Sequence, residues 1–291
     1  MKKVYALLFS ILFLSNLSAQ VGPEDGTPSE EDMNPAGVAV TPSTVWMSGK
    51  PGTKTNQEVK VKNDSKKLMK FSISFNDFQM NEAGKVEFLE AGEGEYSLSK
   101  WINVSPTFFE LEPGEKQIIN VTVDVPSSEK GEQAAWTIMM VDEVKDRQPL
   151  DAEPGPDEMA FGIIPSFGIG VYLFQNPPNV AVSETEIMDM RLTDREVAES
   201  DGEMQKILNM QVKNHGDGIS YCKTYMELTN YKTGEQSRMS KRSFVVLPKF
   251  TRSFSHGLPE NLPSGDYSLM VVLDFGSEEE VEAAEIEFSI P

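Results

Sequence analysis

Residues 58–77 read EVKVKNDSKKLMKFSISFND, and this stretch decides the fold. Valines alternate with charged residues up to Asn63, where a polar turn begins. The next run alternates again, with Phe71, Ile73 and Phe75 at every second position. Because successive side chains of a β-strand point to opposite faces, the pattern predicts two strands joined by a hairpin-like turn.

The same pattern returns in the second half of the chain. Residues 208–214 read LNMQVKN, a turn HGDG follows, and residues 219–230 read ISYCKTYMELTN. Both first strands end on Val-Lys-Asn, and each copy is followed later by a Leu-x-Pro or Leu-Pro turn, at residues 111–113 and 247–248. Short strands between turn signals are typical of β-sandwiches. The sequence therefore predicts an all-β protein with two immunoglobulin-like β-sandwich domains in tandem.

Residues 167–180, FGIGVYLFQNPPNV, mark the joint between the two copies. The apolar alternation stops at Pro177 and Pro178, and two successive prolines form a stiff, extended joint without backbone donors. We therefore predict an N-terminal domain over residues 38–176 and a C-terminal domain over residues 180–291. The two domains are expected to fold as separate modules.

Residues 1–19 have the order of a secretory signal peptide: two lysines, an apolar run and small residues up to Ala19. The apolar run is too short for a membrane span. We expect cleavage near Ala19 and an exported chain, periplasmic or beyond. Residues 20–37, acidic and rich in proline and glycine, predict a disordered leader. No later run is apolar enough to span a bilayer, so no stable membrane insertion is expected.

Composition and motifs argue against several classes of function. The net charge of −20 argues against nucleic acid as a partner, because phosphate binding needs a basic surface. Cys222 alternates with Met226 and Leu228 on one strand face, which favours a buried apolar role. His215 and His256 have no partner residues at metal-ligand spacing, and no hydrolase, metalloprotease or P-loop motif is present. The sequence thus predicts no enzyme, no metal and no cofactor.

The tryptophans leave two interpretations open. Trp136 lies in the apolar run AAWTIMM and is expected in a core. Trp46 and Trp101 belong either to a core or to a ligand-binding groove.

A long polar run, DEVKDRQPLDAEPGPDEMAFGIIPS at residues 142–166, precedes the apolar strand before the joint. A loop of this length is uncommon in a compact β domain unless it has a function. One hypothesis is edge-strand addition, in which residues 163–173 offer main-chain hydrogen bonds and alternate side chains to another protein. Phe167 and Ile169 would then be exposed in the free protein, and the glycines beside them would admit a neighbouring backbone. The other hypothesis is an interior strand after a disordered loop.

The order of these features resembles the periplasmic pilus-assembly chaperones, the PapD-like family. The run SPTFFELEPG at residues 105–114 is similar to a turn of that family, and Leu173, Phe174 and Pro177 resemble the end of its first domain. The resemblance covers residues 38–180 and reaches the second domain by shape. It implies that the strand before the joint lends apolar side chains to an incomplete subunit. The candidate partner-binding residues are Ile163, Pro165, Phe167, Ile169, Val171 and Tyr172.

That family also binds the subunit's terminal carboxylate with two basic residues. The matching positions here hold Tyr172 and, in the run VTPSTVWM, Thr44 or Val45. Without a cation the carboxylate loses a charge-assisted bond of roughly 1.5–3 kcal/mol, which argues against loading of pilus subunits. The sequence predicts an exported envelope protein that binds an extracytoplasmic protein partner, an envelope or surface subunit, by edge-strand addition. The alternative is a structural or cell-wall-binding component that takes peptidoglycan glycan.

Overall fold

The computed structural model describes residues 37–145, 165–180, 184–196, 204–277 and 280–291. Strands β1 to β18 dominate these residues, and their only helical segments are two short 3-10 turns, η1 (Ser99–Trp101) and η2 (Glu129–Glu132). The predicted signal peptide, nearly all of the predicted leader and residue Ile163 lie outside the described residues.

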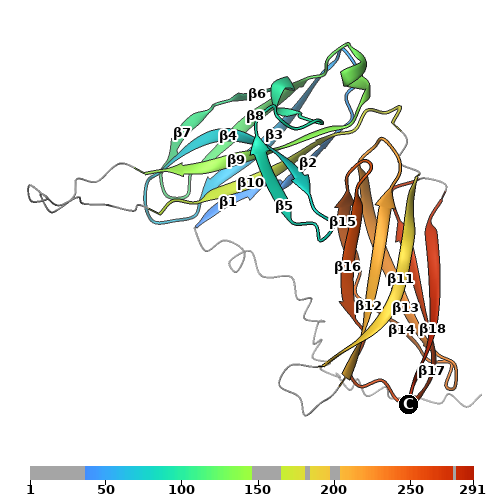
Figure 1. Cartoon of the computed structure of the whole chain (residues 1–291). Coiled ribbons are helices and arrows are strands. Elements are labelled where there is room, and N and C mark those ends of the chain that lie inside the picture. Colours follow the sequence, from blue (N-terminus) through green and yellow to red (C-terminus); the bar gives the residue numbers. More distant parts are fainter. Residues whose placement is uncertain (1–36, 146–164, 181–183, 197–203, 278–279) are drawn as a thin grey trace, which may run out of the picture. The chain divides into compact units, whose positions relative to one another are not determined.

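Strands β1 to β10 form the two sheets of a first sandwich (Figure 1). One sheet has the order β1-β3-β8-β6, and the other has the order β2-β10-β9-β4-β5, with β7 beside β4. The pairing of β2 with β10 is parallel, and the other strand pairs of this sandwich are antiparallel. The strands are β1 Val38–Thr41, β2 Thr44–Met47, β3 Lys54–Asn63, β4 Met69–Met80, β5 Val86–Glu90, β6 Ile102–Ser105, β7 Phe108–Leu111, β8 Lys116–Asp124, β9 Ala135–Val144 and β10 Gly168–Gln175.

Strands β11 to β18 form a second sandwich with antiparallel pairing throughout. Its sheets have the orders β11-β12-β16 and β14-β13-β17-β18, with β15 beside β13. The strands are β11 Thr185–Glu196, β12 Met204–Asn214, β13 Ser220–Asn230, β14 Gln236–Arg238, β15 Arg242–Val246, β16 Thr251–Gly257, β17 Gly265–Asp274 and β18 Glu282–Ile290. The prediction of two tandem immunoglobulin-like sandwiches is therefore confirmed. Residues Ala36–Pro291 group into one compact unit, and separate folding of the two modules stays a prediction.

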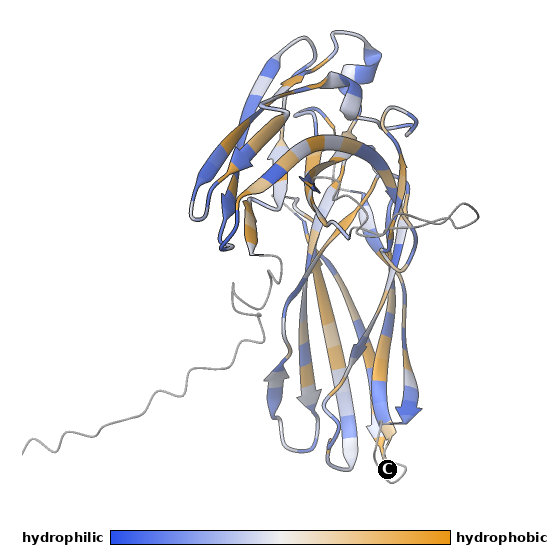
Figure 2. Ribbon diagram, turned by 90° about the vertical axis from the view of Figure 1, so that its left-hand side faces the viewer, coloured by the Kyte–Doolittle hydropathy of each residue, from blue (hydrophilic) through white to orange (hydrophobic). Residues whose placement is uncertain are grey.

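The alternation read from the sequence builds a core inside each sandwich. Figure 2 shows apolar and polar residues following one another along the strands. The apolar side chains of facing sheets meet between them, which removes them from water and stabilises the sandwich. Buried members of the first core include Val59, Val61, Phe71, Val121, Val123, Met139, Val141, Val171 and Leu173. Buried members of the second include Leu208, Met210, Val212, Cys222, Met226, Leu269, Val271 and Leu273.

A buried asparagine explains the repeated Val-Lys-Asn. Nδ2 of Asn63 donates to the backbone oxygen of Leu111 at 2.9 Å, and Nδ2 of Asn214 donates to that of Val246 at 3.1 Å. In both copies Nδ2 also donates to the carbonyl four residues further on, at 2.7 Å. Each side chain thus satisfies a carbonyl of its own turn and one at the end of the strand before the Leu-Pro or Leu-x-Pro turn, and the second of these bonds is buried in both copies.

The prediction of a hairpin-like turn is wrong about the sheets that the two strands join. The turn after Asn63 joins β3 to β4, and the turn after Asn214 joins β12 to β13, but in each case the two strands belong to different sheets. The asparagine side chain supplies partners that a hairpin would take from its own backbone ladder. The chain can therefore cross from one sheet to the facing sheet at this point.

Candidate binding sites on the first sandwich

Strand β10 has a partly open edge. It pairs with β9 along its whole length, from Gly168 to Gln175, but with β2 only over residues 172–175. Among the described residues, nothing pairs with the other side of residues 168–171. An unpaired strand edge is a template for another strand, so the structure contains the geometric requirement for edge-strand addition.

The backbone groups at this edge belong to two glycines. The N–H of Tyr172 donates to the carbonyl of Ser43 at 3.0 Å, on the β2 side. Residues two apart in a strand direct their N–H and C=O groups to the same side, so those of Gly168 and Gly170 point to the open side. The carbonyl of Phe167, by contrast, accepts from the N–H of Glu143 at 2.9 Å.

The side chains of β10 do not follow the expected exposure. Val171 is 0% exposed, and the partly buried Phe167 and Ile169 pack against the core of the first sandwich. The expectation that Phe167 and Ile169 are free in the isolated chain is wrong, because odd-numbered side chains of this strand point between the sheets. Pro165 is exposed, and Tyr172 lies half-buried on the opposite face. Their role in partner binding, like that of the other candidates, stays a prediction.

The two glycines also differ from their expected role. A Cβ at Gly170 would lie 2.5 Å from Cδ1 of Ile138, and one at Gly168 would collide with the side chain of Asp142. Side chains of β9 therefore occupy the space above both glycines. The glycines make room for the chain's own sheet, and the route left to a partner is the edge of the strand.

The two positions that match the chaperones' basic residues lie side by side. Tyr172 and Thr44 are register partners in the parallel pairing of β10 with β2, and Val45 is buried in the core. Neither register partner carries a positive charge.

Aromatic side chains gather on one face of the sheet β2-β10-β9-β4-β5 of the first sandwich, on the side away from the facing sheet. Trp136 is 4% exposed, its ring stacks on that of Tyr96 with centroids 4.6 Å apart, and its Nε1 donates to the carbonyl of Phe78 at 2.8 Å. It is buried as expected, but outside the space between the two sheets. Trp46 is 39% exposed and stacks on Phe174 at 4.6 Å. The third tryptophan, Trp101, packs half-buried against the main core.

Beside this aromatic group lies a buried carboxylate that the sequence analysis did not single out. Asp77 in β4 is 1% exposed, and its Oδ2 accepts the N–H groups of Gly92 at 2.7 Å and Gly94 at 3.0 Å. Its Oδ1 is buried without a hydrogen-bond partner. A cavity of about 80 Å³ adjoins it. The available signal was a lone acid between two phenylalanines, in the run FNDF at residues 75–78.

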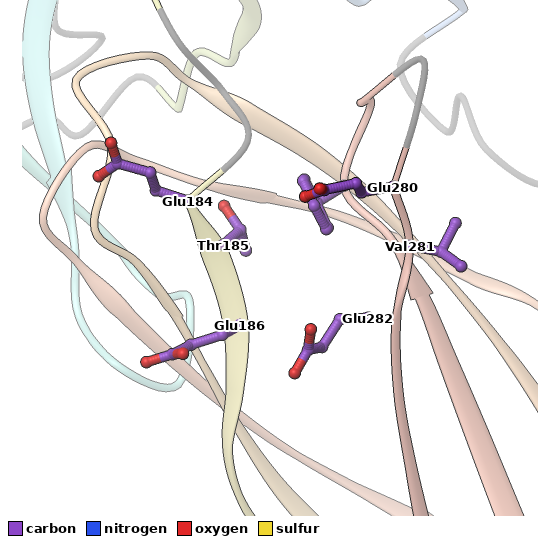
Figure 3. A pocket seen from close by; sticks show the side chains of 7 residues that line it. Glu184, Thr185, Glu186, Glu280, Val281 and Glu282 are labelled. Atoms are coloured by element: carbon purple, nitrogen blue, oxygen red, sulfur yellow. The ribbon is translucent and has the colours of Figure 1, made fainter.

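A larger cavity, of about 600 Å³, lies in the second sandwich near the starts of β11 and β18 (Figure 3). Glutamates 184, 186, 280 and 282 line it together with Thr185, Phe275 and Val281. Glu186 lies 2.8 Å from Nε2 of His215. Within the part of the chain that is described, no group of three or more His, Cys, Asp or Glu side chains could hold a metal ion.

Cys222 has the predicted surroundings of a buried apolar residue. Its side chain belongs to the second core. Burial raises the pKa of the thiol to about 12, so the thiolate that a nucleophile or metal ligand needs does not form near neutral pH.

Among the described residues, no helix is long and apolar enough to cross a membrane.

Comparison with known proteins gives a family match that covers the aromatic group around Trp136 but not the open edge of β10. Residues 44–138 match the family model "WxL Interacting Protein, peptidoglycan binding domain". This segment begins at β2 and ends within β9. It therefore contains Asp77, Tyr96 and Trp136, but not the open edge of β10. No curated protein matches the chain.

Solved structures of fimbrial chaperones are similar to this chain. A chaperone–tip adhesin complex of CFA/I fimbriae biogenesis shares 14% identity with a TM-score of 0.44, covering 87% of this chain and 98% of the other. The class 5 fimbriae chaperone CfaA shares 14% identity with a TM-score of 0.42, covering 87% and 99%. The E. coli chaperone DraB shares 14% identity with a TM-score of 0.37, covering 87% and 98%.

Proposed function

We propose that the protein is an exported component of the cell envelope whose first sandwich binds the glycan of peptidoglycan. The family-model match over residues 44–138 carries this proposal. Within that segment, Trp46, which is 39% exposed, and the half-buried Tyr96 support it, because sugars are bound by aromatic faces together with a few placed polar groups. Protein binding at the edge of β10 is a second candidate, and catalysis is not part of the proposal.

Binding to purified peptidoglycan sacculi tests the first candidate. The chain from residue 20 onward, incubated with sacculi stripped of attached polymers, is expected to sediment with them and to be released by a soluble muramidase digest. The chain from residue 20 onward has a net charge of −22, since Lys2 and Lys3 are removed from the −20 of the whole chain. Ionic adsorption to acidic polymers is therefore unfavourable, and binding should persist at about 1 M salt, where charge attraction is screened within about 3 Å. Cellulose is the control surface. Equal retention on cellulose, or none on sacculi, would contradict glycan binding.

The second candidate, edge-strand addition to an envelope protein subunit, is favoured by the open side of residues 168–171. It predicts a pattern of amide exchange in the isolated chain. The N–H of Gly170 points to the open side and should exchange at least about tenfold faster than that of Val171, which points to β9. Tyr172, whose N–H donates to Ser43, is the internal control.

Residue-resolved hydrogen exchange by nuclear magnetic resonance measures this pattern. Slow exchange at Gly170 in the free chain would show that the edge is already covered, and would remove the second candidate. Envelope proteins that co-purify with the chain can then be added singly, and a true edge-strand partner should slow exchange at Gly168 and Gly170 together.

A further inference from the structure

The sheet of β13, β17 and β18 in the second sandwich carries a group of exposed apolar and aromatic side chains on its outer face. Cys222, Met226 and Leu269 of these strands point into the second core, so the residues that alternate with them point outward. Four large outward side chains are between 36% and 52% exposed: Tyr221, Tyr225, Tyr231 and Met270. Apolar groups that gather on one surface mark interaction sites, and tyrosine and methionine are enriched at protein interfaces.

Charge changes sign across this outer face. The basic side chains lie on or beside β13, toward β14 and β15: Lys223, Arg238 and Lys241. The acidic side chains at the opposite edge, on β18, are Glu285 and Glu287. Glu227 and Asp274 offset part of the positive charge. The ion pairs formed among the described residues do not involve Lys241, Glu285 or Glu287. The face is therefore positive along one side and negative along the other.

The strand register arranges these groups in rows across the sheet. One row consists of Arg238, Glu227, Met270 and Glu285, and the next contains Tyr225, Val272 and Ala283. Nζ of Lys241 lies 4.8 Å from the ring centroid of Tyr225, so its charge belongs to the basic end of the second row. Each row thus begins with a basic group and has apolar side chains in or near its middle, and Glu285 ends the first row.

A two-fold axis along the strands, between β13 and β17, makes this face complementary to itself. The rotation lays the basic side of one copy over the acidic side of the other. Arg238 and Lys241 of one copy then meet Glu285 of the other, and Tyr225 meets Val272. An interface between identical subunits needs this property, because each subunit contributes the same surface.

We propose that the outer face of β13, β17 and β18 is the interface of a homodimer. Four columns of side chains about 4.8 Å apart and about ten residues long, at about 3.3 Å each, give roughly 600 Å² of flat area. A standard stable interface takes about 800 Å² from each partner, so the expected dimer is weak, with a dissociation constant in the micromolar range. The two acidic chains repel each other, but this repulsion is screened beyond about 8 Å at physiological ionic strength. The proposal does not depend on glycan binding by the first sandwich.

Sedimentation velocity of the chain from residue 20 onward tests for the dimer. In about 0.15 M salt, the mean sedimentation coefficient is expected to rise from the monomer value near 1 µM to the dimer value at about a hundredfold higher concentration. A monomer value over this whole range would overturn the proposal.

Charge reversal tests the arrangement of the two copies. The variant Arg238→Glu/Lys241→Glu and the variant Glu285→Lys each place like charges opposite one another, so each should weaken the dimer at least about tenfold. An equimolar mixture of the two variants should regain dimers, because both contacts of the mixed pair again join opposite charges. The control Lys60→Glu/Lys116→Glu makes the same change in net charge at exposed positions of the first sandwich and should dimerise as the wild type does. A reversed variant that dimerises like the wild type, or a mixture that stays monomeric, would contradict the proposal.

The variant Tyr225→Ser removes an apolar group from the centre of the face. It should also weaken the dimer at least about tenfold, and it decides together with the wild type if a charge-reversed variant does not fold. Unchanged dimerisation of Tyr225→Ser would contradict the proposal. If the wild type is monomeric and Tyr225→Ser is no longer retained on sacculi, the face takes a glycan and the proposal is wrong.

Discussion

Replacing Val171 by aspartate is expected to unfold the first sandwich. The side chain is 0% exposed and belongs to the main core between the sheets. A carboxylate there has no partner, and burying it costs several kcal/mol, which is comparable to the roughly 5–15 kcal/mol that holds a domain together. Urea unfolding followed by tryptophan fluorescence should show that the unfolding transition of the first sandwich is lost. The exposed Asn120 of β8, replaced by aspartate, is the control.

The same measurement on Phe167→Asp tests whether the loss of stability follows the burial of the side chain along β10. Phe167 is only partly buried against the core. Phe167→Asp should therefore lower the free energy of unfolding by less than Val171→Asp does, but by more than Asn120→Asp does. A Val171→Asp chain with the stability of the wild type would show that β10 is not held in the core. Its apolar side chains would then be free for a partner, as the hypothesis of edge-strand addition expected for Phe167 and Ile169.

Replacing Asn63 by alanine is expected to destabilise the first sandwich by about 1–3 kcal/mol, since its bond to the Leu111 carbonyl is buried and a buried group left unpaired costs about that much. The side chain is 0% exposed. Its Nδ2 serves the carbonyls of Lys67 and Leu111, and its Oδ1 accepts the N–H of Ser65 at 2.9 Å. Alanine leaves all three without that partner.

The repeat supplies a matched experiment in the second sandwich. Asn214 serves the carbonyls of Gly218 and Val246, and accepts the N–H of Gly216 at 2.9 Å. Asn214→Ala should therefore lower the free energy of unfolding by a similar amount, whereas Asn120→Ala should change it by less than about 0.5 kcal/mol. Equal values for Asn63→Ala and Asn120→Ala would show that the shared motif is not what ties the turns together.

Much of the fold was predictable because it follows from local patterns. Alternation with period two predicted the strands, and the two Val-Lys-Asn turns predicted two copies of one unit. The sheet that each strand joins was not predictable. Asn63 looks like any polar turn residue in the sequence, and only the position of Leu111, 48 residues further on, shows that its amide pairs with a second turn.

The candidate sites were less predictable, for a related reason. Asp77 is one of many acids in an acidic chain, and its burial depends on Gly92 and Gly94, which close over it from the loop after β5. An edge position for residues 163–173 was one of two hypotheses, beside that of an interior strand. The location of the open edge depends on β2, which stops pairing at Tyr172.

The sequence by itself determined which residues of β10 share a face, because strand geometry directs alternate side chains to opposite sides. It did not determine which face is inside. Both faces carry large apolar residues, Val171 and Leu173 on one, Tyr172 and Phe174 on the other, so either could have met the core. The tertiary structure decided this, because the facing sheet buries the odd-numbered side chains and leaves a partner only the edge of residues 168–171.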